Sequence, residues 1–178
     1  MNHNSKAFRI REIPYAPISV VCLIYDRQQV RHPLDGFGFL VPRGQAVRML
    51  GCIWTGSIFP EHVAEGRVLL RTMVGGARDP EGAGMADGPL VDLVHGELRR
   101  ILGEIEGRPR EVRIFRHPLG IPQYALGHLG RLERLQSGLG RAPGLHLAGN
   151  AYRGIGVNDC VREASDLAGR ITSDDPGQ

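Results

Sequence analysis

The segment LHLAGNAYRGIGVNDC, residues 145–160, predicts a short strand, a turn with two closely spaced glycines, and the start of a helix. Residues 145–148 are apolar enough for the strand, and the helix is expected over residues 157–171. Gly154 and Gly156 carry no side chain, so the backbone there can approach a bulky planar or phosphate-bearing ligand. A helix start offers unpaired N–H groups and partial positive charge, which would stabilise an anion. A tight turn without a ligand explains the same pattern, so this segment alone leaves both interpretations open.

Four segments in the first half of the chain predict the strands of a sheet. Residues 18–25, ISVVCLIY, form a continuous apolar run rich in β-branched side chains, which indicates a strand buried on both faces. Residues 37–41, 47–54 and 67–74 are further strand candidates, separated by segments that contain Gly and Pro. We expect these segments to form a sheet of three or four strands.

The second half predicts two amphipathic helices with a short strand between them. Apolar side chains recur at helical spacing over residues 89–102, and Pro89 suits the first turn of that helix. A stripe of leucines predicts a helix over residues 126–139, and residues 111–115 are a strand candidate. The expected fold class is therefore α/β, with a mixed sheet.

Length and composition narrow the class of protein. The 178 residues suffice for one domain-sized core, and no run of 18 apolar residues predicts a transmembrane helix. The formal net charge is +3, but the basic residues are scattered, which argues against a nucleic-acid-binding arm. Residues 1–6 lack the apolar core of a signal peptide, so a cytoplasmic protein is expected.

The cysteines and histidines show no metal-binding pattern. Cys22, Cys52 and Cys160 are isolated from one another, so reduced thiols are expected rather than a disulfide framework. The seven histidines form no HxxxH pair and no cluster with cysteine. No metal site is therefore expected.

Four motifs resemble those of the flavin-dependent protoporphyrinogen oxidases, in the order in which that family carries them. Residues 147–160 match the pattern LAGNxYxGIGVNDC, and residues 122–128 match PQYxxGH. Residues 36–42 match GFGxLVP, and residues 73–76 match MxGG. The resemblance extends over residues 18–171, and the ordered combination of four motifs makes it specific.

The resemblance implies the C-terminal part of a Rossmann-like, FAD-binding flavoprotein. Residues 1–116 would be part of its substrate-binding domain, and residues 117–178 the C-terminal part of its FAD-binding domain. Such enzymes oxidise protoporphyrinogen IX to protoporphyrin IX in haem biosynthesis, and FAD passes the electrons to oxygen. The tetrapyrrole and oxygen would therefore be the partners of the complete enzyme, with no nucleic acid involved.

The resemblance also implies two sets of site residues. The residues expected to lie against or near the flavin are Asn150, Ile155, Gly156 and Val157. The residues expected to line or lie near the tetrapyrrole cavity are Phe37, Gly38, Leu40 and Met73. Apolar and aromatic side chains suit a flat macrocycle that must be desolvated, and the flavin itself supplies the redox chemistry, so no catalytic side chain is assigned.

Structural alternatives stand beside several of these assignments. Phe37 and Leu40 would also fit the core of an ordinary strand, and Met73 would fit a gap in a core. His128 is expected to form a local hydrogen bond instead of taking part in chemistry. Asp159 lies in the first helical turn, where a carboxylate offsets the helix dipole.

The dinucleotide fingerprint GxGxxG, which such flavoproteins need to hold FAD, does not occur in residues 1–30. The glycine pairs at 36–38 and 154–156 both lack the third glycine. We therefore expect an incomplete FAD site in this chain, a strand 145–148 with unpaired edges, and a last helix with little to pack on. The chain would be inactive alone, as a truncated piece of an enzyme, one chain of a split enzyme with a separate FAD-binding chain, or a non-catalytic remnant.

Two further questions stay open at this point. A coproporphyrinogen-oxidising relative is the alternative enzyme, since its substrate differs only by additional carboxylates. Peripheral membrane contact would suit an apolar tetrapyrrole product, although no basic amphipathic helix demonstrates it. The sequence also leaves open the oligomeric state.

Overall fold

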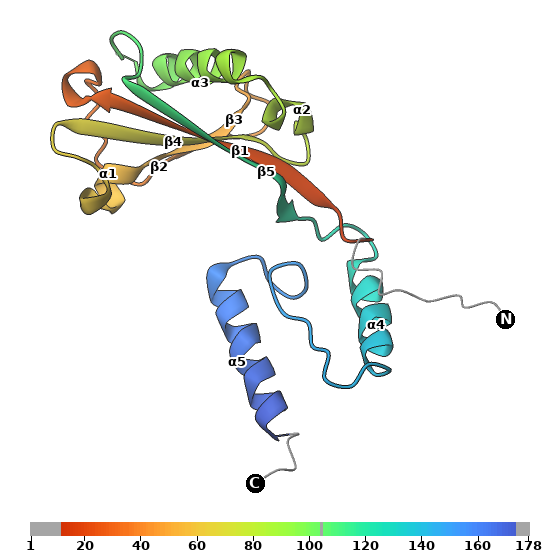
Figure 1. Ribbon diagram of the computed structural model, residues 1–178. Helices are drawn as coiled ribbons and strands as arrows, with labels where there is room; N and C mark the ends of the chain where they lie inside the picture. The colour runs from red at the N-terminus through yellow and green to blue at the C-terminus, as the bar shows by residue number, and fades with distance from the viewer. Residues whose placement is uncertain (1–11, 104, 174–178) are drawn as a thin grey trace. The chain divides into compact units, whose positions relative to one another are not determined.

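The computed structural model describes residues 12–103 and 105–173, which form two compact units. The first unit is Ala16–Gly120, and the second contains residues 12–15 and 121–173. The expected boundary between residues 116 and 117 lies four residues before the division at Gly120. Figure 1 shows the elements of both units along the chain.

The first unit is built on a five-stranded sheet with the strand order β2-β3-β4-β1-β5. The strands are β1 (Tyr15–Asp26), β2 (Gly38–Leu40), β3 (Met49–Trp54), β4 (Arg67–Gly75) and β5 (Glu111–Pro122). All of the strands predicted for this half of the chain are present. β5 is longer than the predicted segment 111–115, and its last two residues belong to the second unit.

The sheet is antiparallel rather than mixed. β1 pairs antiparallel with β4, as do β2 with β3 and β3 with β4. β5 runs opposite to β1, because Arg110 donates to Ile24 near one end while Gln123 donates to Pro14 near the other. Neighbouring parallel strands need a crossover of a dozen or more residues, usually a helix, whereas antiparallel neighbours accept short connections. Residues 41–48 between β2 and β3 are too few for a crossover, and residues 55–66 between β3 and β4 contain only two single-turn helices, so these strands fold back on one another.

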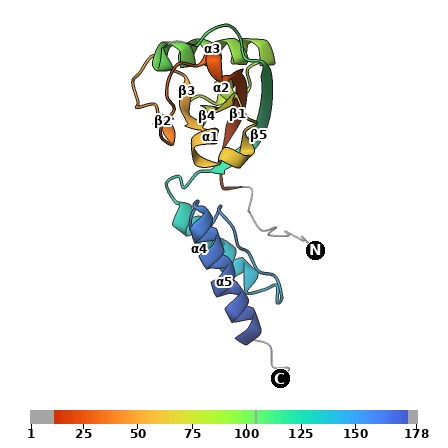
Figure 2. The same ribbon diagram turned by 90° about the vertical axis from the view of Figure 1, so that its left-hand side faces the viewer.

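One face of this sheet carries the core. In β1 the side chains of Val21, Leu23 and Tyr25 are fully buried, while the intervening side chains are half-buried. The prediction that residues 18–25 are buried on both faces is therefore wrong, since Val20, Cys22 and Ile24 are only half-buried. The buried face packs against the long helix α3 (Asp87–Leu102), which lies along one side of the sheet in Figures 1 and 2.

Helix α3 ends at Leu102 as predicted and begins at Asp87, two residues before the predicted start at Pro89. Pro89 occupies the first turn, and Gly103 ends the helix with a φ of 82°, which favours glycine. A buried hydrogen bond of 2.9 Å joins the hydroxyl of Tyr25 to Nδ1 of His95 on this helix. Burial lowers the pKa of His95, so the imidazole is held neutral beside the core.

Four short elements were not predicted, because each spans a single turn with no measurable periodicity. They are η2 (Arg27–Gln29), α1 (Thr55–Ile58), η3 (Pro60–His62) and α2 (Pro80–Ala83). They close the ends of the sheet. Ser19 of β1, for example, donates a 2.6 Å hydrogen bond to the carbonyl of Ala83 in α2.

The second unit contains α4 (His128–Leu139) and α5 (Val157–Ser173), both near their predicted positions. The predicted strand over residues 145–148 is absent, because an extended segment becomes a strand only when another strand pairs with it, and no described strand does so. A small cluster of Ile13, Leu135 and Ala151 forms the core of this unit. No described side chain of α5 is buried, as expected for a helix with little to pack on. Among the described residues, no helix is long and apolar enough to cross a membrane.

Candidate functional site

The face of the sheet away from α3 carries an apolar row that crosses four strands. Residues that pair directly across strands point to the same face, and the register aligns Leu40 with Gly51, Gly51 with Met73, and Met73 with Val20. Two of these residues, Leu40 and Met73, belong to the predicted tetrapyrrole set. We call this face the open face, and the row Leu40–Gly51–Met73–Val20 the apolar row.

Two glycines bring β2 unusually close to β3. A Cβ atom at Gly51 would lie 2.5 Å from the carbonyl oxygen of Phe39, and one at Gly38 would overlap the carbonyl oxygen of Cys52. Gly38 also has a φ of 135°, which L-residues rarely adopt. The close approach of the two backbones therefore requires glycine at these positions, and the side chain of Leu40 packs against the buried Gly51.

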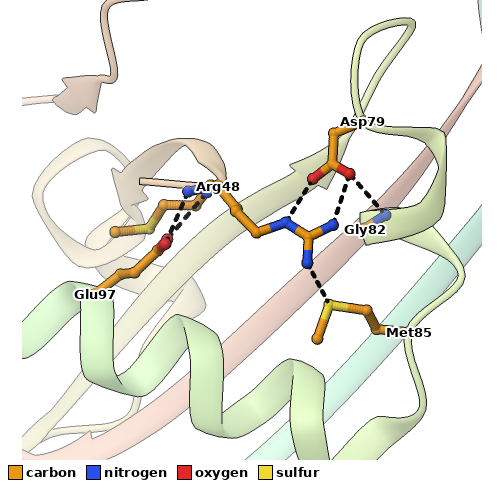
Figure 3. A network of polar contacts seen from close by, with 6 residues as sticks. Arg48, Asp79, Gly82, Met85 and Glu97 are labelled. Carbon is orange, nitrogen blue, oxygen red and sulfur yellow. Dashed lines mark hydrogen bonds and ion pairs between the residues drawn. The ribbon is translucent and has the colours of Figure 1, made fainter. Parts of the chain in front are cut away.

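A β-bulge at Leu50 sets the position of Gly51 in this row. Met49 pairs with Val74 and Gly51 with Met73, so Leu50 is the extra residue of β3. The carboxylate of Glu97 on α3 accepts hydrogen bonds from the backbone N–H groups of Arg48 (2.7 Å) and Met49 (3.0 Å), immediately before the bulge (Figure 3). Glu97 thereby fixes the start of β3 against the helix that covers the core.

The side chain of Arg48 extends the same network to α2. Its guanidinium binds both carboxylate oxygens of Asp79 (2.6 and 2.9 Å) and lies 3.5 Å from the sulfur of Met85 (Figure 3). Asp79 in turn accepts from the backbone N–H of Gly82 and caps α2. The hydrogen bond from Arg48 holds the pKa of Asp79 below its usual value, so this ion pair persists throughout the neutral range.

The predicted tetrapyrrole residues are all in the first unit, on or beside β2 and β4. The side chain of Phe37 is 77% exposed and that of Leu40 is 82% exposed, so the alternative that they are strand core residues is wrong. Met73 is half-buried on the open face, between its cross-strand neighbours Gly51 and Val20. Exposed apolar side chains of this kind make a surface that would gain from covering by an apolar ligand.

In the second unit the two remaining motifs contact each other through Tyr124. Its hydroxyl donates to the carbonyl of Asn150 (2.9 Å) and accepts from the backbone N–H of Gly154 (2.7 Å). The ring of Tyr124 stacks on His128 at a centroid distance of 4.1 Å, and Nε2 of His128 lies 3.0 Å from the carbonyl of Tyr152. His128 thus forms a hydrogen bond, but the partner is not local as predicted: it lies 24 residues away, in the segment that leads into the glycine-rich turn.

The predicted flavin contacts lie on this turn and on the first residue of α5. Ile155 is 49% exposed and Val157 is 80% exposed, Gly156 lies between them, and Asn150 is exposed at the start of the turn. The turn thus presents apolar side chains and a glycine at a helix N-terminus, which suits contact with a planar ring.

The glycines of this turn also have a structural reason within the chain. A Cβ atom at Gly154 would overlap the side chain of Asp159, and one at Gly156 would lie 3.0 Å from its carboxylate oxygen. The carboxylate therefore folds back over the turn at the positive end of α5, as its position in the first helical turn predicts. The glycine pair is accordingly not evidence for a ligand on its own.

Glu97 and Tyr124 are the residues that sequence analysis missed as organisers of the two sites. Glu97 falls seven residues after Leu90 and three after Val94, which places it on the buried face of α3. An acidic residue on an apolar helix face is a detectable pattern, because burial of a carboxylate requires donors. For Tyr124 the sequence shows that it belongs to a motif but not what its hydroxyl contacts.

The three cysteines are free, and burial raises the pKa of the Cys52 thiol to about 12. A buried neutral thiol in the core face of β3 is inert, which agrees with the expectation of reduced thiols.

Comparison with known proteins agrees with the motifs. The profile of the flavin-containing amine oxidoreductase family matches residues 3–172. A chloroplastic protoporphyrinogen oxidase from Nicotiana tabacum is 34% identical over 167 residues, covering 89% of this chain and 30% of the relative. A coproporphyrinogen III oxidase from Bacillus subtilis is 30% identical over 145 residues, covering 81% of this chain and 31% of the relative.

A solved structure shows the same fold. The crystal structure of a protein from Exiguobacterium sp. 255-15, proposed to be a protoporphyrinogen oxidase, has a TM-score of 0.76 and 31% sequence identity. The match covers 90% of this chain and 35% of that protein. The chain therefore spans about a third of the length of the relatives that it matches.

Proposed function

Because the chain belongs to the flavin-containing amine oxidoreductase family, we propose that it supplies the tetrapyrrole-facing sheet and the flavin-contacting turn of a porphyrinogen oxidase. The substrate would be protoporphyrinogen IX, oxidised to protoporphyrin IX in haem biosynthesis with oxygen as the electron acceptor. The similarity to protoporphyrinogen oxidases over 89% of the chain supports this proposal.

The observation that carries the proposal is the apolar row on the open face. Leu40, Gly51 and Met73 lie side by side on three strands, with Leu40 82% exposed beside the half-buried Met73 and the buried Gly51. Phe37 is exposed and lies immediately before β2. These residues would bind one face of the macrocycle and exclude water from it, which is the environment that a large apolar ring requires.

The residues of the second unit would bring the macrocycle's electron acceptor into place. FAD, when bound, would accept the electrons that the porphyrinogen loses. Ile155, Gly156 and Val157 fit contact with its ring system, since they present exposed apolar atoms at a helix N-terminus. Tyr124 would hold this turn through its two hydrogen bonds to Asn150 and Gly154.

These 178 residues would form only part of the FAD site. They contain no GxGxxG fingerprint to hold the dinucleotide, so the chain alone should be inactive. The remaining contacts would come from further residues of a longer protein or, in a split enzyme, from a separate FAD-binding chain.

A coproporphyrinogen-oxidising enzyme is the second candidate. The similarity to the coproporphyrinogen III oxidase from Bacillus subtilis favours it. The two candidate substrates share the tetrapyrrole ring and differ in the number of carboxylates, so relative affinity for the two porphyrins separates the proposals.

The proposal is tested by titrating the purified chain with protoporphyrin IX. Trp54 is the single tryptophan and ends β3, two residues after Cys52, so its fluorescence reports on this part of the sheet. Bound porphyrin absorbs in the range of tryptophan emission, and we expect saturable quenching together with a shift of the porphyrin absorption band. Tighter binding of coproporphyrin III would favour the second candidate. Failure of both porphyrins to bind would contradict the proposal.

The flavin part is tested by absorbance spectra before and after addition of FAD. We expect the purified chain to be colourless and to retain no flavin after gel filtration, because most contacts of an FAD site are missing from its sequence. Stoichiometric retention of FAD would show that these residues complete a cofactor site, and the proposal of a partial site would fall.

A further inference from the structure

Arg71 places a positive charge on the open face, next to the apolar row. It lies on β4, and the register aligns it with Ile53 of β3 on one side and with Cys22 of β1 on the other. Residues two apart on a strand share a face and lie about 7 Å apart. The side chain of Arg71 therefore emerges on the same face as Met73, one residue pair further along the sheet.

The surroundings of Arg71 are apolar. Leu69 and Met73 flank it along the strand, and all of these side chains, like that of Arg71 itself, are half-buried. The side chain of Arg71 is hydrogen-bonded to the thiol of Cys22. Burial raises the pKa of this thiol, and Arg71 offsets only part of that rise. Within residues 12–103 and 105–173, no ion pair joins Arg71 to a carboxylate.

Holding the Arg71 guanidinium partly buried costs free energy unless an anion binds to it. A half-buried guanidinium among apolar side chains gives up part of its hydration, and a hydrogen-bonded anion is what repays that loss. On the core face of the same strand, by contrast, Leu70 and Val74 are fully buried and carry no charge. Arg67, on the same face of β4, is paired with Asp26, whereas Arg71 stands beside the apolar row and thus matches a ligand that is apolar over most of its area and negatively charged at an edge.

We propose that Arg71 is a specificity-determining residue that binds a carboxylate of the tetrapyrrole lying on the apolar row. This inference rests on the proposed function. The macrocycle would cover Leu40, Gly51 and Met73, while one propionate side chain reaches the guanidinium beside them. Arginine suits this role because its planar group donates two parallel hydrogen bonds to one carboxylate and keeps its charge at all relevant pH values.

The test compares protoporphyrin IX with its dimethyl ester, in which both carboxylates are esterified. Binding to the chain and to Arg71→Gln is measured by quenching of Trp54 in the same detergent-containing buffer. We expect Arg71→Gln to lose about tenfold in affinity for protoporphyrin IX, as is typical for loss of a charge-assisted hydrogen bond, and to bind the ester as well as the unchanged chain does. Arg71→Lys should recover part of the loss, because it keeps the charge but not the paired donors.

Arg99→Gln is the matched control, since it removes the same charge from the exposed side of α3, which covers the opposite face. It should leave both affinities unchanged. Equal affinity of Arg71→Gln and the unchanged chain for protoporphyrin IX would overturn the inference while leaving the proposed function intact. An equal loss for the acid and the ester would also overturn it, because the residue would then act on the shape of the sheet. If the unchanged chain binds neither porphyrin, the proposed function itself falls.

Discussion

Replacing Gly38 with alanine is expected to displace β2 and to weaken porphyrin binding by about 5- to 100-fold. The added methyl group would overlap the carbonyl oxygen of Cys52, and the φ of 135° is strained for any L-residue. Strain of this kind costs about 1–3 kcal/mol. β2 is a three-residue strand at the edge of the sheet, so it can separate from β3 while the core stays folded. Titration with protoporphyrin IX measures the loss, and amide hydrogen exchange at Val41 and Trp54, whose N–H groups donate across β2 and β3 to Leu50 and Phe37, measures the separation.

Gly96→Ala is the matched control for this substitution. Gly96 lies within α3, and a Cβ atom there meets nothing within 4 Å. Alanine should stabilise the helix by about 0.5–1 kcal/mol, because glycine loses more backbone freedom on folding. Unchanged porphyrin affinity and a raised unfolding midpoint are expected. If Gly38→Ala bound porphyrin as tightly as Gly96→Ala, the close approach of β2 to β3 would have no role in binding.

Replacing Leu70 with alanine is expected to lower the free energy of unfolding of the first unit by about 2–5 kcal/mol. Leu70 is fully buried at the centre of β4, where it pairs with Leu23 and Trp54 against α3. Small proteins are stable by only about 5–15 kcal/mol, so the loss is a large fraction of the total. Urea unfolding followed by Trp54 fluorescence measures it, and this signal belongs to the first unit alone because the chain has one tryptophan.

Leu40→Ala tests the opposite face with the same chemical change. Leu40 is 82% exposed, so its truncation should change the free energy of unfolding by less than about 0.5 kcal/mol. Its loss of apolar contact area should nevertheless weaken porphyrin binding by about tenfold. The two variants together predict that one face of the sheet determines stability and the other determines binding. A large loss of stability in Leu40→Ala would contradict this division.

Much of the site could be located from the sequence because its motifs are short and local. Phe37, Gly38 and Leu40 do lie in or just before β2, and Met73 lies in β4 with only β3 between them, although their role in binding stays a prediction. Asn150 and the residues 155–157 do share one turn. The organising residues were missed because their partners are distant in the chain, as for Glu97, which binds the backbone of Arg48 and Met49.

The sequence by itself determined the positions of the main strands and helices, the α/β class and the family. These depend on local patterns, namely β-branched runs, helical spacing and motif order, which need no knowledge of distant residues. It also determined that no dinucleotide fingerprint lies within these residues.

Only the tertiary structure decided the antiparallel pairing, the bulge at Leu50, the exposure of Leu40 and the apolar neighbours of Arg71. It also decided that residues 145–148 form no strand here. Each of these depends on backbone hydrogen bonds between segments far apart in the chain, and a shift of one residue in their register turns every side chain to the other face. Local side-chain patterns cannot specify that register, because both faces of β1 are largely apolar.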